Sequence, residues 1–181
     1  MESPDVAPLE NLLACLEVPA LPLQLLLKQK PEWRELPVVV ISEDRPQGIV
    51  TWLNAKAREF RILPGQTYAA ALGLCRDLRA SIVPPAAIGT CIAHLVTLLR
   101  TYCPRIEPSD DEPGVFWLDT RGLWRLWPPK KWAYTIIDAL AAITFSSVMA
   151  IGFSHFGTYA AARAIAVALE RPTQRNRPPL L

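Results

Sequence analysis

The sequence lacks a strong excess of charge of either sign, and this limits the partners to be expected. Nineteen Lys and Arg residues stand against seventeen Asp and Glu residues, which leaves a formal net charge of +2. A chain so close to neutrality has no overall field that would draw it onto nucleic acid or an acidic membrane. Any contact with a polyanion should therefore be a local patch of basic side chains.

Paired cysteines are missing as well. The chain has four cysteines, at Cys15, Cys75, Cys91 and Cys103. None has the C-x-x-C spacing that is typical of zinc sites, and each lies in an apolar or helical context. We therefore expect four reduced core residues and no zinc site.

The sequence also lacks a recognisable secretory signal and an uninterrupted apolar run long enough to span a membrane. Residues 1–10 are acidic and broken by proline rather than basic and then apolar, so the cytoplasm is the expected location. The most apolar run, residues 132–153, is interrupted by Asp138 and by two serines before it reaches a span of about 20 residues. This run favours a buried helix followed by a buried strand.

What the chain does have is a regular alternation of strand-like and helix-like segments, with 51% hydrophobic residues. This is enough for one buried core with a small lobe attached. Short apolar or β-branched runs predict strands at 12–18, 36–44, 48–54, 79–85, 114–123 and 148–154. Apolar residues at helical spacing predict helices at 21–30, 54–62, 67–78, 86–104, 128–145 and 158–170.

The order of these segments predicts an α+β fold. The second and third strands flank the turn-forming "DRPQ" and should make a hairpin. Antiparallel strands with crossover helices on one side would form the main sheet, and an all-helical insert would form a separate small lobe.

Five motifs then occur in a fixed order. "KPEWRELPVVV" enters the second strand, and "GIVTWLNAKAREFRILPGQTYAAALGLCRDL" follows it, with "YCPRIEP", "WLD" and "MAIGFSHFGTYAAARAI" further on. In the longest motif the matching places are Asn54, Ala57, Arg58, Pro64-Gly65 and Leu74-Cys75. Together the motifs resemble the Y-family (UmuC/DinB-like) translesion DNA polymerases, over roughly residues 14–166.

The resemblance implies a palm-like sheet of βαββαβ order with a small helical fingers lobe. The palm-like domain would comprise residues 11–50 and 81–170, and the fingers-like helical insert would comprise 51–80. Residues 1–10 and 171–181 are expected to be flexible ends, because the basic tail is rich in proline and has no apolar period.

The acidic stretch between residues 105 and 119 raises the question of a two-metal site, which needs carboxylates that converge on one point. In the family that the chain resembles, an Asp-Glu pair before the "LD" of a strand supplies metal ligands. Counting back from that "LD", these places hold Gly114 and Val115, neither of which can bind a cation. The first-strand Asp of the family falls on Glu17, and the next expected Asp falls on Pro19.

The other carboxylates of this stretch are expected to lie in a solvated turn. Asp110, Asp111 and Glu112 precede Pro113. A slip of the strand that brought them into the ligand places would disrupt "VFWLD" as a core strand.

The residues expected on the nucleotide side have changed too. Ala55 stands where the family has a triphosphate-binding Tyr, Arg58 persists, and the Lys expected after "GFS" is replaced around His155 and Phe156. This combination resembles the ImuB-type accessory proteins of bacterial damage-induced (SOS) mutagenesis. The resemblance implies a non-catalytic scaffold that is not an enzyme, with no catalytic, cofactor-binding or metal-binding residues.

The same resemblance implies partners. These are an ImuA-type RecA-like protein, an error-prone C-family DNA polymerase and the sliding clamp, although no clamp-binding motif is evident in this chain. Proteins of this type are much longer, so the chain is expected to be an N-terminal fragment or a shortened relative.

Two sets of side chains are expected to make intermolecular contacts. Lys56, Arg58 and Arg61 on the fingers helices would give weak, nonspecific contacts to DNA phosphates. At least one of Trp124, Trp127 and Trp132 would lie in a protein interface, because tryptophan is enriched in interfaces as well as in cores.

Two alternatives stay open. The first is an active Y-family polymerase fragment with unusual ligands, which depends on whether Asp110 or Asp111 can reach Glu17. The second is an unrelated α+β enzyme with a cysteine nucleophile, for which neither histidine has a recognisable cysteine partner in the sequence.

Overall fold

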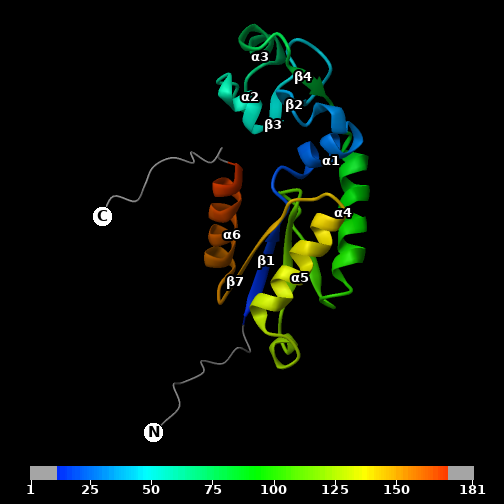
Figure 1. Ribbon diagram of the computed structural model, residues 1–181, viewed down its shortest axis with the longest axis vertical. Helices are drawn as coiled ribbons and strands as arrows, with labels where there is room; N and C mark the ends of the chain where they lie inside the picture. Colours follow the sequence, from blue (N-terminus) through cyan, green and yellow to red (C-terminus); the bar gives the residue numbers. More distant parts are fainter. Residues whose placement is uncertain (1–11, 171–181) are drawn as a thin grey trace, which may run out of the picture.

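The computed structural model describes residues 12–170, whose strands form a larger and a smaller sheet (Figure 1). The larger sheet has the order β5-β6-β1-β7, with strands Leu13–Glu17 (β1), Ile106–Pro108 (β5), Val115–Asp119 (β6) and Val148–Gly152 (β7). The smaller sheet has the order β3-β2-β4, with strands Val38–Ile41 (β2), Val50–Leu53 (β3) and Arg79–Ser81 (β4).

Six α-helices and two short 3₁₀ turns connect these strands within the described residues. The helices are Leu21–Gln29 (α1), Ala55–Glu59 (α2), Tyr68–Leu74 (α3), Pro85–Leu99 (α4), Pro129–Ala142 (α5) and His155–Glu170 (α6). The 3₁₀ turns are Pro31–Trp33 (η2) and Leu123–Arg125 (η3). The α+β fold class is thereby confirmed.

The larger sheet is covered on both faces. Alternate residues of β1 point to opposite sides, and Leu16 joins a buried cluster with Leu95 of α4 and Ile136 of α5. Cys15 points the other way and packs with Ala162 of α6. Figure 1 shows α6 on one side of β1, and α4 and α5 on the other. The expectation of helices on one side only is therefore wrong, because both sets of alternating positions in β1 are apolar.

The smaller sheet belongs to a separate lobe at one end of the molecule, beyond α1 (Figure 1). Its central strand β2 pairs antiparallel with β3, as expected for the hairpin, and parallel with β4. Ala57 of α2 and Ala71 of α3 are buried against this sheet beside Val39. The insert is thus not all-helical, and β2 lies in its sheet rather than in the palm sheet. The pattern of apolar residues along a strand indicates which of its faces is buried, but it does not indicate which strand it pairs with.

The boundaries of the two parts stay a prediction. What the strand pairing adds is that residues 38–41, placed within the palm-like range 11–50, pair with strands of the smaller lobe. The ends at 1–10 and 171–181 lie outside the described residues.

One strand was missed altogether. β5 consists of three residues of the acidic stretch and pairs antiparallel with β6 at the edge of the larger sheet. The carboxylates that follow it therefore lie in the loop of a β5–β6 hairpin. This loop places one of them, Glu112, near the end of β1, as described below.

Two further expectations concern the four cysteines and the apolar run of residues 132–153. All four cysteines are buried and none is in a disulfide. The apolar run forms α5 followed by β7, as expected. Of the helices between residues 12 and 170, none combines the length and apolar character that crossing a membrane requires.

Candidate functional site at the end of strand β1

The site lies where β1 ends beside the start of β6. Antiparallel pairing places Glu17 directly opposite Val115. Gly114, just before β6, accepts a hydrogen bond of 2.8 Å from the amide of Val18. Its φ of 104° is in the left-handed region, and a Cβ at this position would overlap the Val18 carbonyl oxygen. The backbone at this end of the sheet therefore requires glycine at residue 114.

An arginine from the last helix joins two carboxylates at this point. Arg163 Nη1 lies 2.5 Å from Glu17 Oε1, and Arg163 Nη2 forms an ion pair with Glu112. Glu17 is almost fully buried, with 2% of its side chain exposed, whereas Arg163 and Glu112 are each 39% exposed. Tyr159 completes the group, because its hydroxyl donates a 2.5 Å hydrogen bond to Glu112 Oε1. We call these four residues the Arg163 brace.

The brace was not foreseen from the sequence. Glu112 was expected to be solvated, but the loop folds back so that it shares Arg163 with Glu17, and no slip of β6 is needed. Asp110 and Asp111 are exposed. The one available signal was that Arg163 is the only Lys or Arg in the alanine-rich helix α6, which favours a specific buried partner.

The described residues do not fit a two-metal site in this arrangement. No three Asp, Glu, His or Cys side chains between residues 12 and 170 lie close enough together to hold a metal ion. The two carboxylates that do converge are joined by a guanidinium, whose five donors match carboxylate geometry. The chemistry of the brace is therefore that of a partly buried ion pair.

Neighbouring groups are held in their protonated forms. Burial, and then the charge of Glu17, raises the pKa of the Cys15 thiol to about 12, although Arg163 acts in the opposite direction. Burial also raises the pKa of Tyr159, with smaller contributions from Glu17 and Cys15. A thiol with so high a pKa is almost never a thiolate at neutral pH, so Cys15 is unsuited to act as a nucleophile.

The basic residues expected to contact DNA differ in their surroundings. Lys56 Nζ lies 2.6 Å from Glu35 Oε2 and also donates to the Glu35 carbonyl oxygen, so its charge already has a partner. Arg58 is exposed and lines a cavity. Arg61 is exposed and has a φ of 61°. Their role in binding DNA stays a prediction.

The start of α2, which carries two of these residues, is fixed by Asn54. Its side-chain oxygen accepts hydrogen bonds from the amides of Ala57 (2.9 Å) and Val38 (3.1 Å), and its amide nitrogen donates to Leu36 (2.7 Å). Asn54 thus caps the helix and ties it to β2, which gives this residue a structural role.

A cavity of about 850 Å³ lies between the two lobes. Asn54, Ala55 and Arg58 line it from the smaller lobe, and Gln24 and Ser147 line it from the larger one. The position that corresponds to the expected triphosphate-binding Tyr, Ala55, therefore faces this space.

The three tryptophans of which at least one is expected at an interface lie in three different environments. Trp132 is 2% exposed in the main core, and its Nε1 donates a 3.0 Å hydrogen bond to the Tyr102 carbonyl oxygen. Trp124 is partly buried and meets Trp132 edge to face, with ring centroids 5.5 Å apart. Trp127 is 43% exposed. Trp132 is thus a core residue, and of the three side chains Trp127 is the most accessible.

Comparison with known proteins gives one family match and several similar solved structures. The model of the impB/mucB/samB family matches residues 17–162. No curated protein matches the chain. Similar solved structures include an insertion ternary complex of Dbh DNA polymerase, with a TM-score of 0.71 and 15% identity over 87% of this chain and 46% of that chain. DinB from Sulfolobus solfataricus gives a TM-score of 0.73 and 15% identity over 87% and 45%.

A DinB-family error-prone DNA polymerase from Sulfolobus solfataricus is also similar, with a TM-score of 0.69 and 14% identity over 88% of this chain and 44% of that chain. The chain spans less than half the length of these three proteins. Its sheet and small lobe define the palm-like fold of the Y-family DNA polymerases. The chain belongs to the impB/mucB/samB family.

The expectation that the chain is not an enzyme is wrong. Its family and fold are those of Y-family DNA polymerases, which are enzymes. Gly114 and Val115 at the expected ligand places do not by themselves show a loss of activity.

Proposed function

We propose that the chain is the palm-and-fingers part of an ImuB-type protein that serves bacterial translesion synthesis by holding other mutagenesis proteins together. The proposed partners are an ImuA-type RecA-like protein, an error-prone C-family DNA polymerase and the sliding clamp. The family and the palm-like fold support the translesion setting.

The observation that carries this proposal is the Arg163 brace. By the sequence resemblance Glu17 stands at the place of the family's first-strand Asp, and it shares Arg163 with Glu112. Such an ion pair joins α6 to β1 and to the β5–β6 loop. The ion pair thus fastens three segments of the palm to one another.

An exposed apolar turn supports contacts with proteins. Leu126 and Trp127 are 77% and 43% exposed in the segment that joins β6 to α5. Large exposed side chains of this kind are typical of binding surfaces, in which a few buried aromatic anchors give most of the binding energy.

A second function, template-directed DNA synthesis, is favoured by the cavity between the lobes. Arg34 and Arg58 both line it, so it offers positive charge where the palm meets the smaller lobe. Among the similar structures is an insertion ternary complex of a DNA polymerase. Synthesis by this chain would require that Arg163 leave Glu17 and Glu112 so that they can bind metal ions.

One pair of assays separates the two functions. The purified chain is mixed in turn with the RecA-like protein, the C-family polymerase and the clamp of its own organism, and complexes are detected by co-elution and calorimetry. In parallel, primer extension is measured with Mg²⁺ and Mn²⁺. We expect a complex with at least one of the three proteins. If none binds, the proposal fails, and extension that is lost in Glu17→Ala would establish the second function.

A further inference from the structure

The end of the palm opposite the smaller lobe carries an exposed apolar turn beside two lysines. The turn around η3 lies at the foot of the molecule, near residue 125 on the colour bar (Figure 1). Leu126, Trp127 and Tyr134 are 77%, 43% and 55% exposed. Lys130 and Lys131 are exposed at the start of α5, and Lys131 Nζ lies 5.9 Å from the centre of the Trp127 ring. We call these five residues the Trp127 surface.

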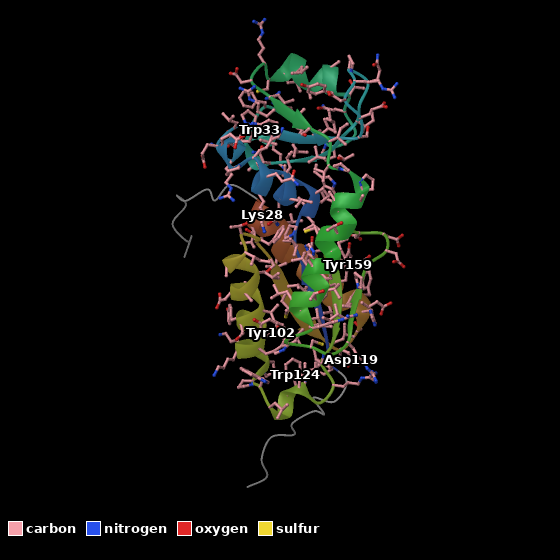
Figure 2. The ribbon with its side chains drawn as sticks, turned by 90° about the vertical axis from the view of Figure 1, so that its right-hand side faces the viewer. Lys28, Trp33, Tyr102, Asp119, Trp124 and Tyr159 are labelled. Atoms are coloured by element: carbon pink, nitrogen blue, oxygen red, sulfur yellow. The ribbon has the colours of Figure 1, made fainter. Side chains whose placement is uncertain are left out.

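The turn that carries Leu126 and Trp127 is fixed by ring contacts with the core and by hydrogen bonds. Trp124 and Trp132 meet edge to face, and Trp132 Nε1 donates a hydrogen bond to the Tyr102 carbonyl oxygen. Figure 2 shows Trp124 and Tyr102 in the lower half of the molecule, away from the smaller lobe. The amides of Leu126 and Trp127 both donate 2.9 Å hydrogen bonds to the Leu123 carbonyl oxygen. A turn that is already ordered loses little conformational entropy when it binds, so its side chains are suited to act as anchors.

The charge of this segment has one sign. Between Asp119 and Asp138 the sequence has four Lys and Arg residues and no Asp or Glu, and Arg121 among them is paired with Asp119. Two of these cations, Lys130 and Lys131, lie in the first turn of α5, and this turn has no acidic residue. Cations are unfavourable at a helix N-terminus, where the helix dipole is positive. Carboxylates supplied by another molecule would relieve this repulsion.

We propose that the Trp127 surface docks an acidic segment of a partner protein. An apolar pocket of the partner receives Leu126 and Trp127, and Asp or Glu residues at its rim pair with Lys130 and Lys131. This inference rests on the proposed function and names the surface and the chemistry of the partner that this function needs.

Other occupants fit the surface less well. A nucleic acid would match the lysines but would offer no apolar pocket to Leu126, the most exposed aliphatic side chain of the group. A second copy of the chain would bring like charges together, which costs free energy in an interface.

The partner segment is first captured by a photoreactive side chain. p-Benzoylphenylalanine replaces Tyr134 in the full chain, cells are irradiated after DNA damage, and the cross-linked peptide is identified. The captured protein is then purified and its affinity for the chain is measured by calorimetry. We expect the cross-linked peptide to lie beside Asp or Glu residues.

Surface variants then test the two parts of the contact. Trp127→Ala should weaken binding about 30-fold or more, because it removes a central aromatic anchor. Lys130→Glu/Lys131→Glu should weaken it about tenfold or more, with a reduced salt dependence. The matched controls are Leu63→Ala, a 58% exposed leucine of the smaller lobe, and Arg76→Glu/Arg79→Glu, two exposed arginines of that lobe. They should bind like the parent.

Each contrary result has a distinct meaning. The inference is overturned if both surface variants bind like the parent, if the cross-link is to a second copy, or if a short single-stranded oligonucleotide competes for the Trp127 surface. If a mutagenesis protein binds but the surface variants have no effect, the proposed function stands and the surface assignment fails. If the captured acidic protein has no part in mutagenesis and none of the three proposed proteins binds, the surface stands and the proposed function fails.

Discussion

Arg163 and Glu17 are 146 residues apart in the chain and are joined by a 2.5 Å contact between Nη1 and Oε1. The contact fastens α6 to the end of β1, and Glu112 on the β5–β6 loop shares the same guanidinium. Three segments that are distant in sequence are thus held by one side chain.

The first prediction concerns this ion pair. Arg163→Met should lower the free energy of unfolding at neutral pH by about 2–4 kcal/mol, because it removes the guanidinium that pairs with the buried Glu17 carboxylate. Glu17→Gln/Arg163→Met should cost less than Arg163→Met alone, since no charge is then left buried. Urea unfolding of the four proteins in this mutant cycle gives the coupling energy. A coupling energy of zero would show that the pair does not stabilise the fold.

The second prediction concerns Gly114, which replaces the expected aspartate. Gly114→Ala should destabilise the chain by about 2 kcal/mol or more, because its φ of 104° disfavours any side chain and its Cβ would meet the Val18 carbonyl. Gly73→Ala is the control, since Gly73 lies in α3 with open space around it and should gain about 0.5–1 kcal/mol. Thermal melts of both variants measure the difference. Equal stability of Gly114→Ala and the parent would refute the backbone requirement.

Acid sensitivity should be traceable to Asp119. Its hydrogen bonds to Arg121 hold its pKa at about 2, below the ordinary value of 3.8. Because the pKa is lowered in the folded state, the stabilisation is complete above the unfolded pKa and is lost as the pH falls through about 2. The free energy of unfolding of the parent should drop about 1 kcal/mol more between about pH 5 and pH 2 than that of Asp119→Asn, with solvent screening limiting the size.

Asp110→Asn removes one exposed carboxylate of the β5–β6 loop and is the matched control for the loss of a negative charge. If Asp119→Asn and the parent lose stability in parallel, the interaction with Arg121 has no energetic role.

DNA binding should separate two basic residues of the smaller lobe. Arg61→Ala should weaken binding to a short DNA duplex more than Lys56→Ala does, because Lys56 is already paired with Glu35. Loss of one phosphate contact should also reduce the slope of log affinity against log salt by about 1. Fluorescence anisotropy across a salt series measures both effects. A larger effect of Lys56→Ala would contradict this order.

Much of the fold was predictable because its signals are local. The β2–β3 hairpin follows from two β-branched runs around a turn, and α5 followed by β7 follows from one apolar run broken by polar residues. By contrast, β5 has a single β-branched residue, Ile106, beside proline and carboxylates, and its pairing with β6 depends on tertiary contacts.

The candidate site was less predictable because its contacts are non-local. Glu112 looked like a solvated carboxylate, and only the folded hairpin brings it to Arg163, 51 residues further on. Trp127 and Trp132 are the same residue type and lie five residues apart. The side chain of Trp127 is exposed, however, whereas that of Trp132 is in the core. Sequence spacing does not show which face of a short turn meets the core.

The most direct test of the proposed role is the frequency of damage-induced mutation in cells that lack the protein. We predict that deletion of its coding sequence lowers the frequency of mutations after DNA damage several-fold, without changing growth of undamaged cells, and that expression of the parent protein restores it. An unchanged frequency of damage-induced mutations in the deletion strain would contradict the assignment to translesion synthesis.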